Sequence, residues 1–256
     1  MFDFKQSKKN NTKNSLRQQS ITFEMEIRMN TADNLEQFLP ILRTASIFSG
    51  MSDSEILSVL HCMGAFVSDK EKDSYLLRAG DMTSTMGLLL SGRAIVIQED
   101  VWGHRNIMAQ ILPGQTFAEP FAASNGTALN ISVTVIKDCS LLYLDIHRIL
   151  GVCPSACEHH THLIQNLISV LAKKLLLFNE KITHMSKRTT KEKLLSYLSA
   201  EAQRQGSLSF DIPYDRQQLA DYLCVERAAM SAELSRLQKQ GLLTTNKNHF
   251  ILQSVP

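Results

Sequence analysis

The sequence lacks most of the features that place a protein outside a reducing compartment. Its five cysteines are an odd number and are scattered along 256 residues, and neither a secretory signal nor a membrane-spanning apolar run is present. The charge is nearly balanced, with a formal net charge of +2, so composition alone neither requires nor excludes a nucleic-acid partner. We therefore expect a cytoplasmic protein with no membrane partner.

A second absence is local. Lys, Arg and His are all missing from residues 106–136, a stretch of glycine and small residues in which Glu119 is the one charged side chain. A phosphate buried here would rely on backbone amides alone, and Pro120 removes one of those donors. Amides alone are usually too weak to offset the desolvation of a phosphate, so the stretch argues against an anionic ligand.

Composition and periodicity divide the chain into four segments. The first is polar and mildly basic, which predicts disorder or a segment that precedes a true start at Met29. Two short helical patterns follow, the second with a capping box from Ser52 to Glu55, and then many short strand-like runs predict an antiparallel roll. Five glycines spaced eleven or twelve residues apart are expected to mark its turns: Gly80, Gly92, Gly103, Gly114 and Gly126. The expected domains are residues 1–30 (disordered or non-native), 31–155 (helices and roll), 156–187 (long helix) and 188–256 (helical unit with a short β pattern).

The long helix carries an apolar stripe with alternating steps of four and three residues, which is a heptad pattern sustained for three repeats. A second stripe flanks it, so one stripe can face a partner helix while the other packs on the roll. A helix buried within a single domain could show two stripes as well, but the regular period favours self-association. The expected dimer interface is Ile164, Ile168, Leu171, Leu175, Phe178 and Ile182, and the flanking stripe is Leu163, Leu167, Val170 and Leu177.

The stretch "DRQQLADYLCVERAAMSAELSRLQKQGLL" has the spacing of a helix-turn-helix. Asp215 and Gln218 form a capping box at the first helix, and "NKN" predicts the turn of a β wing after the second. An αα-corner that binds no nucleic acid is the alternative. The outward stripe of the second helix is nevertheless suited to DNA, and consists of Arg227, Ala228, Ser231 and Arg236.

Together with "RAGD" and "LSGRA", this helix-turn-helix resembles the CRP/FNR family of bacterial transcription regulators over about residues 35–256. The resemblance implies an α+β fold with a jelly-roll-like sensor roll of the cyclic-nucleotide-binding type, a long dimerisation helix and a C-terminal winged helix-turn-helix. It also implies a homodimer without enzymatic activity that binds operator DNA, and RNA polymerase as a further partner if the protein is an activator.

The family's DNA contacts carry over only in part. Arg227 stands at the first arginine of the family's recognition helix, Ala228 replaces a base-reading glutamate, and Ser231 matches the serine of the oxygen-regulator branch. Alanine can touch a thymine methyl group but cannot bind guanine, so we expect an operator different from the best-known consensus of the family. The residues expected to bind the DNA backbone are Tyr214, Arg216, Gln217, Arg236 and Lys247.

The ligand hairpin departs from the cyclic-nucleotide pattern of the family. Glu119 stands at the glutamate that binds ribose, but Leu129 and Asn130 stand where an Arg-Ser/Thr pair would hold the cyclic phosphate. Cyclic AMP and cyclic GMP are therefore disfavoured, no cofactor is assigned, and either a filled core or an apolar effector remains open. The candidate pocket residues are Glu119, Pro120, Phe121, Leu129 and Asn130.

Cys153 and Cys157 lie four residues apart at an expected helix start, where the helix dipole favours thiolate. They are weak candidates for a redox pair, a haem ligand or a metal site, and two small packed side chains are the alternative. No N-terminal cysteine cluster of the iron–sulfur branch is present, since the first cysteine is Cys62. A further alternative is a ligand-binding roll whose C-terminal domain contacts protein. An enzymatic metal site is disfavoured, because His104 and His147 are isolated.

Overall fold

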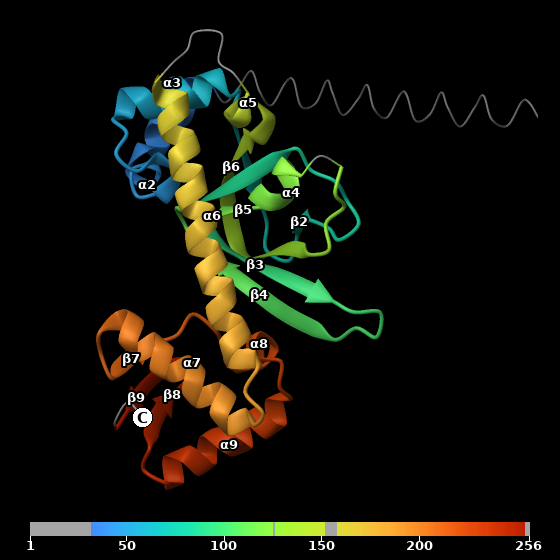
Figure 1. Cartoon of the computed structure of the whole chain (residues 1–256), viewed down its shortest axis with the longest axis vertical. Helices are drawn as coiled ribbons and strands as arrows, with labels where there is room; N and C mark the ends of the chain where they lie inside the picture. The colour runs from blue at the N-terminus through green and yellow to red at the C-terminus, as the bar shows by residue number, and fades with distance from the viewer. Residues whose placement is uncertain (1–31, 125, 152–157, 254–256) are drawn as a thin grey trace, which may run out of the picture.

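The computed structural model describes residues 32–124, 126–151 and 158–253. A helical segment leads into a β-roll, one long helix and a compact C-terminal unit (Figure 1). The capping box predicted at Ser52 is present, because its hydroxyl accepts from the Glu55 N–H and the Glu55 carboxylate accepts from the Ser52 N–H at 2.7 Å. The elements before the roll are η1 (Ala32–Phe38), α2 (Leu39–Leu42), η2 (Ser46–Phe48) and α3 (Asp53–Cys62).

Six antiparallel strands form the roll in the order β1-β6-β3-β4, with β2 paired to β6 and β5 paired to β3. The strands β3 and β6 are longer than the short runs that the sequence suggested, with 15 and 14 residues. Two short helices, α4 and α5, interrupt and follow the strands. The bounds are β1 (Phe66–Lys70), β2 (Tyr75–Leu77), β3 (Thr85–Glu99), β4 (Arg105–Ile111), β5 (Thr116–Phe117), α4 (Glu119–Ala123), β6 (Ser132–Asp145) and α5 (Ile146–Leu150).

Gly92 lies inside β3, so the prediction that it marks a turn was wrong. Its φ is +88°, and a β-carbon there would lie 2.2 Å from the carbonyl oxygen of Asp138 on β6. The register between β3 and β6 shifts around this position, which is a bulge that bends the strand. Glycine is therefore required for the close approach of two long strands, and not for a reversal of the chain.

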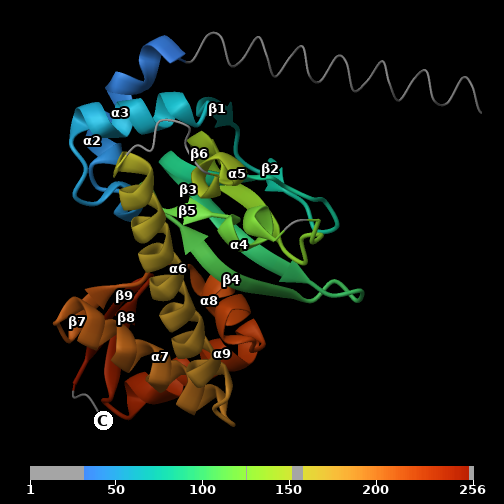
Figure 2. The same cartoon turned by 45° about the horizontal axis from the view of Figure 1, so that its top comes forward.

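The hairpin between β3 and β4 projects from the roll, away from the long helix, as Figure 2 shows. The Asp100 carboxylate holds its tip by accepting from the backbone N–H groups of Trp102 and His104, both at 2.9 Å. Val101 and Trp102 are 90% and 80% exposed at this tip. The chain has one tryptophan, and it lies in water and not in the core.

The helix α6 (Glu158–Met185) runs from the N-terminal helices to the C-terminal unit, beside the roll (Figure 1). Its inner stripe begins as predicted, since Leu163, Leu167 and Val170 are buried in a core with the N-terminal helices and the roll. Leu177 was expected to continue this stripe but is 53% exposed. No helix among the described residues, α6 included, is long and apolar enough to cross a membrane.

The outward stripe of α6 stays uncovered along most of its length. Ile164 and Leu171 are half-buried against the same core, whereas the next residues of the stripe face water. The exposed members are Ile168 (62%), Leu175 (61%), Phe178 (40%) and Ile182 (63%).

The C-terminal unit packs a helix-turn-helix against a sheet in the order β7-β9-β8. Gly206 ends the first helix in a left-handed conformation, as predicted, and Lys247 has a φ of +51° at the turn of the β8–β9 hairpin. The hairpin is the wing that the sequence indicated. The elements are α7 (Thr190–Gln205), β7 (Ser209–Asp211), α8 (Arg216–Leu223), α9 (Arg227–Lys239), β8 (Leu243–Asn246) and β9 (His249–Leu252).

One apolar core joins this unit to the roll. Ile95, Ile97 and Ile107 of the roll belong to the same buried cluster as Leu219 and Leu223 of α8. The helix α8 packs directly on β4. The roll and the C-terminal unit, which the sequence divides into separate segments, therefore share one buried core.

Candidate nucleic-acid interface and sensor pocket

The helices α8 and α9 are held at their angle by caps and by apolar faces. The Asp215 carboxylate accepts from the Gln218 N–H at 2.8 Å, so the predicted capping box begins α8. Cys224 ends α8 in a left-handed conformation with φ +51° and is exposed, so it forms the turn without packing in the core. The buried faces are those predicted, with Leu219, Ala220 and Leu223 on α8 and Met230, Leu234 and Leu237 on α9.

The opposite face of α9 is open to solvent. Arg227 is its first residue, and Arg227, Ala228 and Ser231 are all exposed. Arg236, five residues after Ser231, is also exposed and pairs with Glu233 at 2.7 Å. The exposed half of α9 thus carries Arg227, Ala228 and Ser231 near its start and Arg236 at the far edge, and a helix of this size fits a major groove.

The residues expected to bind the DNA backbone lie in different surroundings. Gln217 and Lys247 are exposed, Lys247 at the tip of the wing. Arg216 is half-buried, its guanidinium donates to Thr245 Oγ1 at 2.6 Å, and it lies 4.9 Å from the centroid of the Phe250 ring. Arg216 thereby fastens α8 to the wing, and burial lowers its pKa.

Tyr214 was expected to bind the DNA backbone, but it lies in the core. It is only 7% exposed, and its ring stacks on that of Tyr222 with the centroids 4.8 Å apart. Tyr197 adds a third ring to this cluster, 5.4 Å from Tyr222. Burial raises the pKa of all three hydroxyls, that of Tyr222 to about 12. Tyr214 therefore belongs to the core beneath α8, and its position does not fit the expected contact with a phosphate.

The segment from β5 to β6, identified from the sequence as the ligand hairpin, places Glu119 at the start of α4, after Ala118 in a left-handed conformation with φ +68°. The Glu119 side chain is 2% exposed and pairs with Lys174 of α6 at 2.6 Å. The Lys174 ammonium also donates to the Thr116 carbonyl at 2.6 Å. The cation that this stretch of sequence lacks thus comes from α6, where it neutralises Glu119.

The other candidate pocket residues are largely engaged. Leu129 is buried, and its backbone exchanges hydrogen bonds of 2.8 Å with the Gly80 N–H and the Asp81 carbonyl. Pro120 occupies the first turn of α4, Phe121 is half-buried and Asn130 is exposed. Next to this hairpin, Phe117 is buried in an apolar cluster of the roll.

A signal for the lysine was present in the sequence. Lys174 continues the spacing of the inner stripe of α6, four residues after Val170, and Lys181 follows seven residues later. Long charged side chains at the inward positions of an amphipathic helix need partners, because a buried unpaired charge is costly. The partner of Lys174 could not be named, since Glu119 lies 55 residues earlier.

Removal of the Lys174 charge should measure this pairing. Lys174→Met leaves the buried Glu119 carboxylate without its cation, and we expect the free energy of unfolding to fall by about 3 kcal/mol in urea denaturation. Lys174→Met combined with Glu119→Gln removes both charges and should recover most of that loss. Lys173→Met, at an exposed position of the same helix, is the control. An equal effect of Lys174→Met and Lys173→Met would show that the pair is absent in solution.

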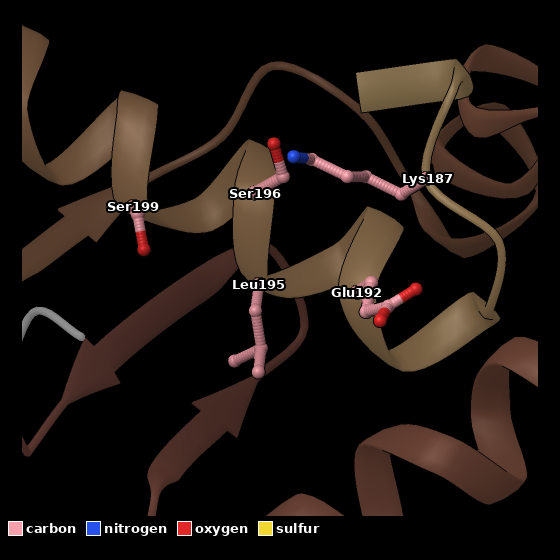
Figure 3. Close-up of a pocket in the computed structure, with 5 residues that line it drawn as sticks. All are labelled: Lys187, Glu192, Leu195, Ser196 and Ser199. Carbon is pink, nitrogen blue, oxygen red and sulfur yellow. The ribbon is translucent and has the colours of Figure 1, made fainter. Parts of the chain in front are cut away.

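An open depression lies elsewhere, at the junction of α6 and α7. It measures about 330 Å³ and is lined by Lys187, Glu192, Leu195, Ser196 and Ser199, with Lys187 reaching toward Ser196 (Figure 3). Ser196 Oγ is 2.8 Å from Nδ1 of His184, which is buried at the end of α6. Its lining comes from α7 and the segment before it, so it is distinct from the ligand hairpin.

The cysteine hypothesis concerns Cys153 and Cys157, which lie outside the described residues. Among the described residues, Cys62 Sγ is 3.8 Å from His160 Nε2, and this contact joins α3 to the start of α6. In the part of the chain that the structure covers, no group of three or more His, Cys, Asp or Glu side chains is arranged to hold a metal ion.

A helix-turn-helix with an exposed second helix, joined to a β-roll by one long helix, is an architecture of DNA-binding regulators. Residues 69–155 match the cyclic nucleotide-binding domain, and residues 192–255 match the Crp-like helix-turn-helix domain. The transcriptional activator protein FnrL of Cereibacter sphaeroides is 23% identical over 211 residues, which cover 78% of this chain and 81% of that protein.

Solved structures share the fold at low sequence identity. FixK2 of Bradyrhizobium japonicum is 19% identical, with a TM-score of 0.58 over 75% of this chain and 93% of that chain. The c-di-GMP responsive global regulator CLP of Xanthomonas campestris is 16% identical, with a TM-score of 0.65 over 79% of this chain and 100% of that chain.

The chain belongs to the CRP/FNR family of transcription regulators, which confirms the resemblance and the expected α+β architecture. Its relatives are transcription regulators and not enzymes.

Proposed function

We propose that the protein is a cytoplasmic homodimer that binds an operator of two half-sites through its paired α9 helices and does not respond to cyclic AMP. The exposed face of α9 carries this proposal, because Arg227, Ala228 and Ser231 face solvent at the start of the second helix of the helix-turn-helix. The second helix of a helix-turn-helix enters the major groove with its first residues at the base edges. RNA polymerase is a further partner if the protein is an activator.

Dimerisation is supported by the outward stripe of α6. Four large apolar side chains at heptad spacing are between 40% and 63% exposed on one helix face. Exposed patches of this kind on a soluble domain mark interaction sites, and a second copy of the same stripe is the occupant that its heptad period fits. The stripe continues along α6 toward the C-terminal unit, so pairing would place two α9 helices on the same side of the dimer.

The insensitivity to cyclic AMP is supported by the charges of the hairpin. Glu119 is already neutralised by Lys174, and the sequence supplies no cation between residues 106 and 136 for a cyclic phosphate. Leu129, at the position of the family's arginine, is buried with its backbone hydrogen-bonded. A filled core and an apolar effector are both compatible with this lining.

Operator binding should be measured by fluorescence anisotropy on DNA from upstream of the protein's own gene and on sequences selected from a random library. We expect specific binding that weakens steeply as salt rises, because Lys and Arg side chains displace condensed counterions. Cyclic AMP at millimolar concentration should leave the affinity unchanged. Failure to select any sequence would remove the operator-binding proposal, and tighter binding with cyclic AMP would remove only its effector part.

A further inference from the structure

Lys181 is a buried charge at the point where three parts of the molecule meet. It lies on the inner side of α6 and is 3% exposed. Its ammonium donates to the Ile107 carbonyl and, at 2.9 Å, to Asn106 Oδ1, both on β4 of the roll. The ring of Tyr222 on α8 lies under it, with the centroid 4.9 Å from Nζ. A single side chain of α6 therefore contacts the roll and the helix-turn-helix together.

Burial disfavours the charged form of Lys181. Burial lowers its pKa to about 8, against an ordinary value of 10.5. Cys224, at the turn after α8, acts on it electrostatically, and the ring beside it belongs to Tyr222, whose own pKa burial raises to about 12. The oxygen acceptors of Lys181 on β4 are the carbonyl of Ile107 and the side-chain amide of Asn106, and neither carries a negative charge. A buried charge of this kind favours one relative orientation of the two packed surfaces and contributes little net stability.

The contact that surrounds Lys181 is otherwise apolar. Ile95, Ile97 and Ile107 pack with Leu219 and Leu223 across the junction of roll and α8. Apolar burial is non-directional, so it favours contact without fixing the angle between the two surfaces. Hydrogen bonds and a ring placed under a cation have preferred geometries. Lys181 supplies such contacts to both β4 and α8, and Gln110 of β4 adds a hydrogen bond of 3.4 Å to the Pro213 carbonyl, just before α8.

We propose that Lys181 is a positioning residue that fixes the angle of the helix-turn-helix relative to α6, and thereby selects the half-site spacing that the dimer accepts. This inference rests on the proposed operator-binding dimer. The helix α9 packs on α8, and α6 carries the proposed dimer stripe on the face next to that of Lys181. A rotation at the junction therefore moves the two α9 helices apart or together, whereas the chemistry of each α9 face stays the same.

The test compares operators whose half-sites are moved by one base pair in either direction from the best selected spacing. Wild-type protein should prefer the best spacing by about tenfold or more, which corresponds to about 1.4 kcal/mol. Lys181→Met should reduce that preference to about threefold or less, with unchanged affinity for an isolated half-site. Lys173→Met, an exposed lysine on the same helix, should behave as wild type.

Each outcome separates the inference from the function on which it rests. If wild-type protein binds no selected DNA, the proposed function fails, and the inference fails with it. If wild-type protein binds DNA with no preference for spacing, or if Lys181→Met keeps the full wild-type preference, the operator-binding function stands and the role of Lys181 is overturned.

A second variant changes the roll side of the junction, and it keeps the test valid if Lys181→Met fails to fold. Asn106→Leu removes one acceptor of the ammonium without touching α6, and should relax the spacing preference in the same direction. Circular dichroism should show native helix content in both variants. A native Asn106→Leu protein with the full wild-type preference would count against the inference.

The pH dependence of stability should show that Lys181 is buried in solution. Since its pKa is lowered on folding, the unfolded chain binds the proton more tightly between pH 8 and 10.5, so folded protein gains stability as pH rises through that window. The unfolding equilibrium constant should fall by up to about tenfold per pH unit relative to that of Lys181→Met. Identical pH profiles for the two proteins would show that the ammonium is solvated.

Discussion

Replacement of Arg227 by alanine should abolish specific operator binding. Arg227 is the first residue of α9 and is exposed, so its guanidinium can reach a guanine edge in the major groove. A bidentate contact of this kind contributes about 1–3 kcal/mol, and a dimer loses it in both half-sites. We therefore expect the specific affinity to fall by about a hundredfold or more, while the salt-dependent affinity for random DNA changes little.

The measurement is fluorescence anisotropy on the selected operator and on a scrambled duplex of the same length. Arg93→Ala is the matched control, because it removes the same charge from an exposed position on the roll. It should leave both affinities close to wild type. Retention of operator affinity within a few-fold in Arg227→Ala would contradict the assignment of α9 as the reading helix.

Two glutamates on the outward stripe of α6 should convert the protein into a monomer. Leu175 and Ile182 are 61% and 63% exposed, so Leu175→Glu with Ile182→Glu leaves the fold of one chain intact. In a dimer the same positions meet their copies, and four carboxylates would be buried close together without partners. Analytical ultracentrifugation should show loss of the dimer, and the operator affinity should fall to that of a single half-site.

The control places the same charges on another face of the helix. Ser169 and Lys173 are exposed and lie away from the heptad stripe, so Ser169→Glu with Lys173→Glu should remain dimeric. If the Leu175→Glu, Ile182→Glu protein sediments as a dimer, or if wild-type protein sediments as a monomer, the stripe is not the self-association surface.

Local features of this fold could be predicted because their signals lie within a few residues. The capping boxes at Ser52 and Asp215 depend on side chains three residues apart, and both are confirmed. The buried faces of α8 and α9 follow from helical periodicity, which the sequence displays directly. The exposed face of α9 follows from the same periodicity, and its role in binding DNA stays a prediction.

Features that depend on the packing of distant segments could not be predicted. Glu119 was expected to lack a cation because its neighbours in sequence have none, yet Lys174 supplies one from a helix that crosses the roll. Tyr214 was assigned to DNA from its place just before α8, and burial under α8 overrides that assignment. In both cases the register of one element against another decides the surroundings of the side chain, and a single sequence does not contain that register.

The position of Trp102 determines what the protein's intrinsic fluorescence can report. The one indole of the chain sits at the tip of a hairpin, already 80% exposed in the folded state, so denaturation changes its surroundings little. Its emission is consequently a poor gauge of global unfolding, which circular dichroism follows instead. The same indole is a built-in optical probe of the hairpin tip, where any molecule that settles on Val101 and Trp102 will shift its spectrum without an added label.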